Sequence, residues 1–333
     1  MFTPNKLLKK SLALVFIFVI FSSAFAANFL QEKSRIITAS AVRVRSDPQT
    51  TAKEITKLAV GTVVKEIGKT EKKEKIGQDQ DFWYQVLLSD GKQGWVFGGF
   101  TESFDESKKE QIYINLVNAR LKEKTSFNDQ MDLVNFLEKT IKEVKTPATL
   151  AELELGQLLA IRQSVDSIPV EKSDSGQYKS WLKKQDAKIY YDEIQGSWKI
   201  RYDVFWDLQE KYKALPVGDK IAWEAANNPL GGECEGFVSC YIGAINSTNA
   251  RYLSLYPNGK NAEEALKVVL EELNTYVEAI DKNESGYRFP EDAETRKDLA
   301  EQLSELRKRL SKVETAKTAA IFKQIEKLET KFR

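Results

Sequence analysis

Hydrophobic and polar residues alternate with a period of two in several short stretches between residues 42 and 97. Residues 42–45 read Val-Arg-Val-Arg, and Ser46-Asp47-Pro48 supplies turn residues directly after them. This pattern is typical of a half-buried strand that ends in a turn. Similar runs follow at residues 55–60, 62–67, 83–88 and 93–97. Because a few short strands cannot enclose a core as an open sheet, the pattern predicts a small all-β barrel.

The hydrophobic period changes to that of a helix from about residue 108 onward. Residues 112–121, 131–144 and 150–161 each place their apolar side chains on one helical face, and Thr146-Pro147 marks the start of the third helix. The pattern predicts a larger all-α domain of helical hairpins over residues 105–290. Residues 291–333 predict a C-terminal helical hairpin or a short coiled coil, broken near Ala316 to Ala320.

One connection in the helical part has a more particular pattern. The turn Tyr256-Pro257-Asn258-Gly259 precedes a helix that carries Ala262, Ala265 and Leu266. This arrangement is similar to the tetratricopeptide-like repeats of envelope proteins. The likeness covers one helix pair and does not recur along the chain, so it implies a helical-hairpin scaffold and no more.

Four motifs in the β-rich part occur in a fixed order: Val44-Arg45-Ser46-Asp47-Pro48, Leu58 to Val64, Trp83-Tyr84-Gln85-Val86, and Asp90 to Val96. Together they resemble the bacterial SH3 (SH3b) domain. The resemblance assigns residues 36–104 to one such barrel and implies a module that binds a peptide or cell-wall element and performs no chemistry itself. Its aromatic residues are the candidate ligand-binding residues: Trp83, Tyr84, Trp95 and Phe97.

The barrel departs from that family pattern in one charged insert. Residues Lys69 to Gln80 are almost entirely charged or polar. Charge runs of this kind are usually solvated, so we expect a lengthened surface loop there. The insert bears on any ligand groove that it borders.

The N-terminus has the composition of an export signal. Lys6, Lys9 and Lys10 precede an apolar run over residues 12–21, and Ala24-Phe25-Ala26 follows it. These features predict a secretory signal peptide over residues 1–26, cleaved after Ala26, and a leader over residues 27–35. Because no later run is long and apolar enough to span a bilayer, we expect no stable membrane span after cleavage and a secreted or periplasmic protein.

The charge balance argues against a polyanionic partner. The chain has 50 Lys and Arg residues and 49 Asp and Glu residues, a formal charge of +1. Removing residues 1–26 removes three lysines and no acidic residue, which changes the charge to −2. Since no basic surplus remains, we expect no nucleic-acid partner.

The only two cysteines, Cys234 and Cys240, are six positions apart. An oxidising compartment favours a disulfide between them, although two free buried thiols remain an alternative. They lie in a Gly-Glu-Cys-Glu-Gly segment, which resembles a segment of secreted bacterial proteins that also carry SH3b domains. That resemblance implies no activity.

The segment also contains the candidate functional carboxylates Glu233 and Glu235. They are interpreted first as acids on a disulfide-closed loop over residues 234–240, with a cation- or small-ligand-binding loop as one alternative. A carboxylate-based cell-wall glycosidase that uses Glu224, Glu233 or Glu235 is the other alternative. Residues 178–223 are rich in aromatic residues, which line either a sugar-binding cleft or, as we prefer, the helical core.

Histidine is absent from the chain. Its absence excludes Ser-His and Cys-His catalytic groups, histidine-ligated zinc and histidine general bases. We therefore expect a non-catalytic binding or scaffold protein without a cofactor or metal. The barrel would contact peptidoglycan or an envelope peptide, and the helical domain would bind a protein partner. The sequence leaves the oligomeric state open.

Overall fold

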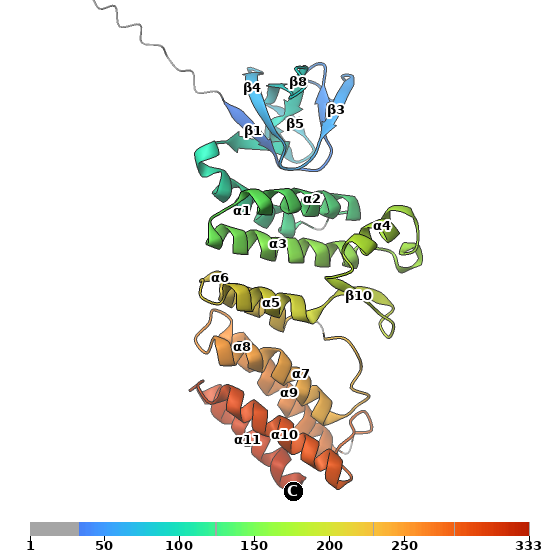
Figure 1. Cartoon of the computed structure of the whole chain (residues 1–333), viewed down its shortest axis with the longest axis vertical. Helices are drawn as coiled ribbons and strands as arrows, with labels where there is room; N and C mark the ends of the chain where they lie inside the picture. The colour runs from blue at the N-terminus through green and yellow to red at the C-terminus, as the bar shows by residue number, and fades with distance from the viewer. Residues whose placement is uncertain (1–32, 124, 229, 283, 333) are drawn as a thin grey trace, which may run out of the picture. The chain divides into compact units, whose positions relative to one another are not determined.

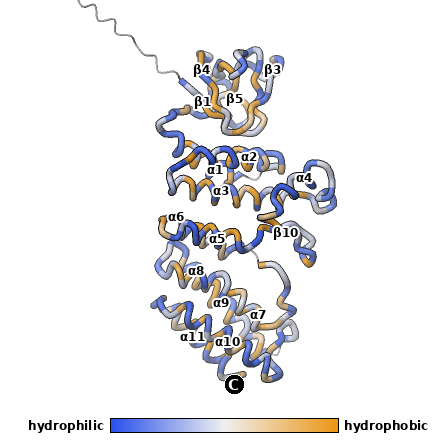
Figure 2. Tube along the Cα trace, in the orientation of Figure 1, coloured by the Kyte–Doolittle hydropathy of each residue, from blue (hydrophilic) through white to orange (hydrophobic). Residues whose placement is uncertain are grey.

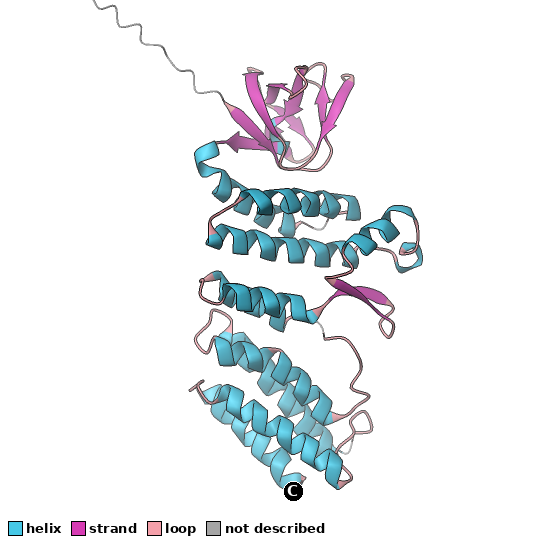
Figure 3. Cartoon of the chain, in the orientation of Figure 1, coloured by secondary structure: helices cyan, strands magenta, loops and turns pink. Residues whose placement is uncertain are grey.

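The computed structural model describes residues 33–332 apart from 124, 229 and 283. Residues 33–333 form one compact unit by their internal contacts. A β-sheet domain comes first and a helical region follows it, as Figures 1 and 3 show. The predicted signal peptide over residues 1–26 lies outside the described residues and stays a prediction. The predicted layout of a small β domain followed by a helical region is confirmed.

The main sheet of the β domain is antiparallel and has seven strands in the order β3-β2-β8-β7-β4-β1-β9. Its strands are β1 (Ser34–Ile37), β2 (Val42–Arg45), β3 (Glu54–Leu58), β4 (Val63–Lys69), β7 (Trp83–Leu87), β8 (Gln93–Phe97) and β9 (Thr101–Phe104). The side chains that alternate inward form a small apolar core: Ile37, Val42, Val44, Val64, Val86, Leu88 and Val96. The predicted strands between residues 42 and 97 are therefore all present.

The sequence analysis did not predict β1, the first strand of the sheet. Ser34 and Arg35, which the sequence assigned to a leader, belong to β1, and β1 pairs with both β4 and β9. Arg35 is only 6% exposed. Its guanidinium lies 3.5 Å from the centre of the Tyr84 ring and bonds Thr101 and Glu66. A buried charged residue breaks the alternating pattern, so this strand was not visible in the sequence.

The sequence Asp90-Gly91 predicts a hairpin between the strands on either side of it, with a positive φ at both central residues of a two-residue turn. The hairpin is present, but its turn differs from this prediction. Leu88 N–H donates to the Lys92 carbonyl and Gly91 N–H donates to the Leu88 carbonyl, which closes a three-residue loop. Within this loop Gly91 is the one residue with a positive φ, at 82°.

The charged insert folds into a hairpin of its own. Strands β5 (Glu74–Ile76) and β6 (Asp79–Asp81) pair in register around Gly77, which has a φ of 63°. Most residues of the insert are exposed, as predicted, but they form a hairpin where the sequence predicted a loop. Strand propensity is weak in this charged stretch, and the turn glycine was the only local sign of the hairpin.

The helical region begins with α1 (Lys109–Lys122), α2 (Phe127–Glu143) and α3 (Pro147–Asp166). These match the three predicted helices, with Ser126 and Asp129 forming a capping box on α2 and Pro147 opening α3. Eight further α-helices of the described residues follow: α4 (Gly176–Lys184), α5 (Tyr202–Tyr212), α6 (Val217–Ala226), α7 (Val238–Ser247), α8 (Asn249–Leu255), α9 (Ala262–Lys282), α10 (Ala293–Leu310) and α11 (Ala316–Lys331).

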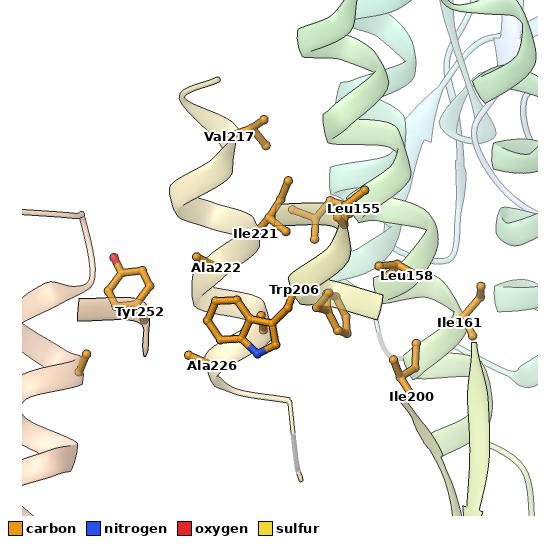
Figure 4. Packing of buried hydrophobic residues seen from close by; sticks show 14 of the residues in the cluster. Leu155, Leu158, Ile161, Ile200, Trp206, Val217, Ile221, Ala222, Ala226 and Tyr252 are labelled. Atoms are coloured by element: carbon orange, nitrogen blue, oxygen red, sulfur yellow. The ribbon is translucent and has the colours of Figure 1, made fainter. Parts of the chain in front are cut away.

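The helices share one hydrophobic core. Hydrophobic and hydrophilic residues alternate along them (Figure 2), and the apolar faces meet those of neighbouring helices. Figure 4 shows side chains of α3, such as Leu155 and Leu158, beside Trp206 of α5 and Ile221 of α6. The same cluster includes Ile36 and Val60 of the β domain. The β domain thus joins the helical core through its own apolar residues.

The region over residues 105–290 is not purely α-helical, contrary to the prediction. Strands β10 (Ile189–Asp192) and β11 (Ser197–Ile200) form an antiparallel hairpin, with Ile189 and Ile200 buried. Gly196 in its turn has a φ of 60°. Four-residue strands are too short for their period of two to stand out among neighbouring aromatic residues.

The C-terminal pair of helices is present, but its break lies elsewhere. The predicted break at Ala316 to Ala320 falls in the first turns of α11, whereas α10 ends at Leu310. Thr315 is the N-cap of α11, and its side chain accepts a hydrogen bond from Thr318 N–H. Alanine favours helix, so the capping threonine is the better boundary signal. Both helices pack on the helical core, α10 against α7 and α11 against α9.

Candidate binding site

A cavity of about 380 Å³ opens on one side of the β domain. Its wall comes from the turn before β2, from β2 itself, from the charged insert, and from the ends of β7 and β8. The lining residues are Ala39, Ser40, Ala41, Val42, Arg43, Arg45, Thr50, Ile76, Trp83, Phe97 and Phe100. The volume is within the ordinary range of ligand pockets.

Three aromatic rings form the apolar wall of this cavity. The centres of the Trp83 and Phe97 rings are 5.7 Å apart, and those of Phe97 and Phe100 are also 5.7 Å apart, both edge-to-face. Trp83 and Phe97 are nearly buried, whereas Phe100 is 36% exposed. Phe100 therefore provides most of the accessible ring surface of this wall, and its edge-to-face contact with Phe97 restricts its movement.

The charged insert holds one of these rings in place. The Trp83 indole N–H donates to the carboxylate of Glu74 in β5. Ile76 of the same strand lines the cavity. Because its only polar atom is bonded to Glu74, Trp83 has an apolar ring left for a ligand. The insert therefore contributes to the cavity wall.

Among the described residues, the charged side chains that line the cavity are Arg43 and Arg45 of β2. Arg43 pairs with Glu54 at 3.0 Å on the exposed surface. Arg45 donates from Nη1 to the Ala52 carbonyl at 2.7 Å. The β2–β3 register shifts at Val44 and Arg45, and such bulges redirect a side chain. Both charged residues of this wall are therefore basic, and one of them is paired with an acid.

The turn before β2 has two unusual features. Ala41 has a φ of 51°, a left-handed conformation that costs a non-glycine residue about 1–2 kcal/mol. The adjacent Ser40 hydroxyl is shielded from solvent and has no hydrogen-bond partner in the described structure. Strained backbone and unsatisfied polar groups concentrate at functional sites. Both residues line the cavity.

The structure separates the four predicted aromatic residues into two pairs. Trp83 and Phe97 line the cavity, whereas Tyr84 and Trp95 do not. Tyr84 lies under the Arg35 guanidinium, and Trp95 is half-buried opposite Arg45 in the β2–β8 pair. The sequence analysis missed Phe100, the two arginines, Ser40 and Ile76. The Arg residues were visible in the Val-Arg-Val-Arg pattern as the outward positions of β2.

Comparison with protein families agrees with the geometry of this domain. Residues 40–102 match the model of the bacterial SH3 domain. This part of the chain is a bacterial SH3 domain. The rest of the chain has no family match. No curated protein and no solved structure matches the chain.

A second cavity, of about 580 Å³, lies between the SH3 domain and α2. Gly61 and Thr62 form one side of it, and Phe136, Lys139 and Glu143 form part of the other. Its lining mixes acidic and basic side chains. It lacks the row of rings and the single sign of charge that distinguish the cavity of the SH3 domain.

The cysteine loop is closed by a disulfide between Cys234 and Cys240. The loop is tied to a distant segment, because Arg288 N–H donates to the Gly236 carbonyl at 2.8 Å and Val238 N–H donates to the Arg288 carbonyl at 3.1 Å. These two hydrogen bonds join residues about fifty positions apart, and no sequence pattern predicted them.

The candidate carboxylates of this loop are on the surface. Glu233 and Glu235 are exposed. A carboxylate oxygen of Glu235 lies 3.9 Å from an Arg288 nitrogen. Within the described residues, no three acidic or cysteine side chains lie close enough together to hold a metal ion. The cation-binding alternative thus gains no support from the loop.

Glu224 has a different environment on α6. Its carboxylate is half-buried and accepts a hydrogen bond from Arg162 of α3 at 2.7 Å. The tryptophans over residues 178–223 divide between the core and its border: Trp181 and Trp206 are nearly buried, whereas Trp198 and Trp223 are half-buried. The ion pair of Arg162 with Glu224 joins α3 to α6.

No helix in the described part of the chain combines the length and the apolar character that crossing a bilayer requires.

Proposed function

We propose that this protein is an extracytoplasmic, non-catalytic binding protein whose SH3 domain holds a peptide or cell-wall element in its cavity of aromatic and basic residues. The observation that carries the proposal is the cavity itself, which combines Trp83, Phe97 and Phe100 with Arg43 and Arg45. A rigid apolar wall with a few polar groups is the usual composition of a ligand site. The helical region is the scaffold and carries the surface for a protein partner.

Four further observations support the location and the absence of catalysis. The N-terminal sequence has a signal-peptide pattern, and the disulfide is compatible with an oxidising compartment. The chain lacks histidine, and Glu224 is engaged with Arg162. The protein would therefore recognise an envelope component and leave it chemically unchanged.

The test is co-sedimentation of the purified full chain with cell-wall sacculi. Phe100→Ala removes the most exposed ring of the cavity and should weaken binding about tenfold, which corresponds to about 1.4 kcal/mol. Ile67→Ala is the matched control, because Ile67 is similarly exposed at 38% in the same domain and does not line the cavity. It should bind like the unmodified protein.

Two outcomes would count against the proposal. Failure of the full chain to pellet with sacculi, at low and physiological salt, would exclude a cell-wall ligand. Release of soluble muropeptides during the incubation would contradict the non-catalytic part. In that case Glu224→Gln, Glu233→Gln and Glu235→Gln would show which carboxylate is responsible.

A further inference from the structure

We infer that the cavity of the SH3 domain takes a short peptide by its C-terminal carboxylate, with Arg45 as the residue that binds the charge. This inference rests on the proposed function, since it names the chemistry of the ligand for the same cavity. It follows from the charges of the lining, from the different partners of the two arginines, and from the apolar wall beside them.

The sign of the charge points to an anion. Arg43 and Arg45 are charged, and the other lining residues are neutral. A cavity with one sign of charge and apolar walls attracts the opposite charge more strongly than open surface does. A neutral or cationic ligand would gain no attraction from these two positive charges.

The two arginines differ in whether an acidic partner balances their charge and in which hydrogen-bond donors remain for a ligand. Arg43 is paired with Glu54 on the exposed surface, so its charge is already balanced. Arg45 has no acidic partner in the described part of the chain. One of its N–H groups is bonded to the Ala52 carbonyl, which fixes the guanidinium and leaves its other donors for a ligand. A guanidinium binds a carboxylate through two parallel hydrogen bonds.

The surroundings of Arg45 favour a carboxylate at the end of a peptide. In the last residue of a peptide, the carboxylate and the side chain are bonded to the same Cα atom, so the two groups lie close together. That side chain can therefore contact the accessible ring of Phe100 while the carboxylate meets Arg45. A cavity of about 380 Å³ suits a small apolar residue and its terminus.

The experiment titrates the full chain by calorimetry with four forms of the tripeptide N-acetyl-Lys-Ala-Ala. The two last residues are either both L-alanine or both D-alanine, and the terminus is either a free carboxylate or a carboxamide. The free carboxylate should bind at least about tenfold more tightly than its carboxamide, the effect of one good charged hydrogen-bonded pair. A preference for the D-alanine form would assign the ligand to wall peptides, and a preference for the L-alanine form to protein C-termini.

Two variants locate the charge. Arg45→Gln should bring the affinity for the free carboxylate down to that for the carboxamide, and Arg45→Lys should retain part of the difference. Lys57→Gln is the matched control, because it removes one positive charge from the exposed face of the neighbouring strand β3 and Lys57 does not line the cavity; it should leave the ratio of the two affinities within about twofold. Circular dichroism of each variant checks that the domain is folded.

The failures of the two proposals can be told apart. Equal binding of the carboxylate and the carboxamide overturns the carboxylate inference and leaves the peptide-binding SH3 domain in place. If the protein sediments with sacculi but binds none of the four peptides, the carboxylate inference is overturned and the wall-binding SH3 domain stays in place. If the sacculi and the peptides both fail to bind, the proposed function itself is overturned.

Discussion

The SH3 domain and the helical region both bury tryptophans, but they use them differently. Trp206 of α5 is 2% exposed and belongs to the large helical core. Trp83 of β7 is 3% exposed, yet it lies outside both apolar clusters and lines a cavity. Exposure alone does not separate the two roles. What separates them is whether the neighbours of the ring are other core side chains or an open cavity.

Mutations in the two regions should therefore be detected by different measurements. A change in the helical core should alter stability, because its rings fill space that nothing else can fill. A change in the cavity of the SH3 domain should alter binding with a smaller effect on stability. The following variants test this contrast.

The largest expected effect is on the helical core. Phe205→Ala removes a fully buried ring of α5 and should lower the free energy of unfolding by about 3–5 kcal/mol. Tyr202→Ala is the control on the same helix, because Tyr202 is 43% exposed; it should change stability by about 0.5 kcal/mol or less. Urea denaturation measures both. Similar losses in the two variants would contradict the description of the core.

The next effect concerns the contact between the two regions. Gly61 has a φ of 79°, and a Cβ atom there would overlap the ring of Phe136 in α2. Gly61→Ala should therefore cost about 2–4 kcal/mol, from the left-handed backbone and from overpacking together. Gly77→Ala is the control: its φ is 63° and its Cβ would meet nothing within 4 Å.

Comparing the two glycine variants isolates the contact. Gly77→Ala should cost about 1–2 kcal/mol, the penalty of the left-handed backbone alone. Denaturation with urea gives both values. An equal cost at the two positions would mean that the SH3 domain and α2 do not pack together at Gly61 in solution.

A third effect separates stability from binding within one variant. Removing the disulfide with the double change Cys234→Ser and Cys240→Ser should lower the free energy of unfolding by about 2 kcal/mol, because the closed loop is short. Binding of the SH3 domain to sacculi should stay the same. Thermal unfolding and co-sedimentation of the double variant check the two halves. A loss of wall binding would show that the helical region takes part in it.

The smallest expected effect is pH-dependent. Burial lowers the pKa of Lys188 below the ordinary value of 10.5, although Glu138 and Glu154 act in the opposite direction. The cost of burying its ammonium is fully present below the folded pKa and is lost as the pH rises through it toward the unfolded value. Lys188→Met should therefore raise the melting temperature at pH 7, by a gain that shrinks as the pH approaches 10.5.

The control for this variant is Lys183→Met, because Lys183 is exposed. It should change the melting temperature little at any pH. Scanning calorimetry of both variants between pH 7 and 10 measures the difference. A gain that grows with pH would contradict the direction of the Lys188 shift.

Much of the local structure could be predicted because it is encoded locally. The strands between residues 42 and 97 and the helices α1 to α3 follow hydrophobic periods of two and 3.6. The elements that escaped prediction all lack such a period. β1 contains the buried Arg35, the hairpin β5–β6 is charged, and β10 and β11 have four residues each.

The candidate site was only half visible for a different reason. Trp83 and Phe97 were candidates because they belong to the family motifs, whereas Tyr84 and Trp95 belong to the same motifs and do not line the cavity. Arg45 is the proposed carboxylate-binding residue because it has no acidic partner in the described part of the chain, whereas Arg43 pairs with Glu54. Pairing across strands depends on register, which no single strand specifies.

The sequence by itself determined the division into a bacterial SH3 domain and a helical region and the main strands and helices, and it favoured the disulfide between Cys234 and Cys240. These depend on short-range periodicity, on motifs and on cysteine spacing. Only the tertiary structure decided which rings face a cavity and which arginine is left for a ligand. Those properties arise where β2, the insert, and the ends of β7 and β8 meet, because burial and charge pairing are set by neighbours distant in the chain.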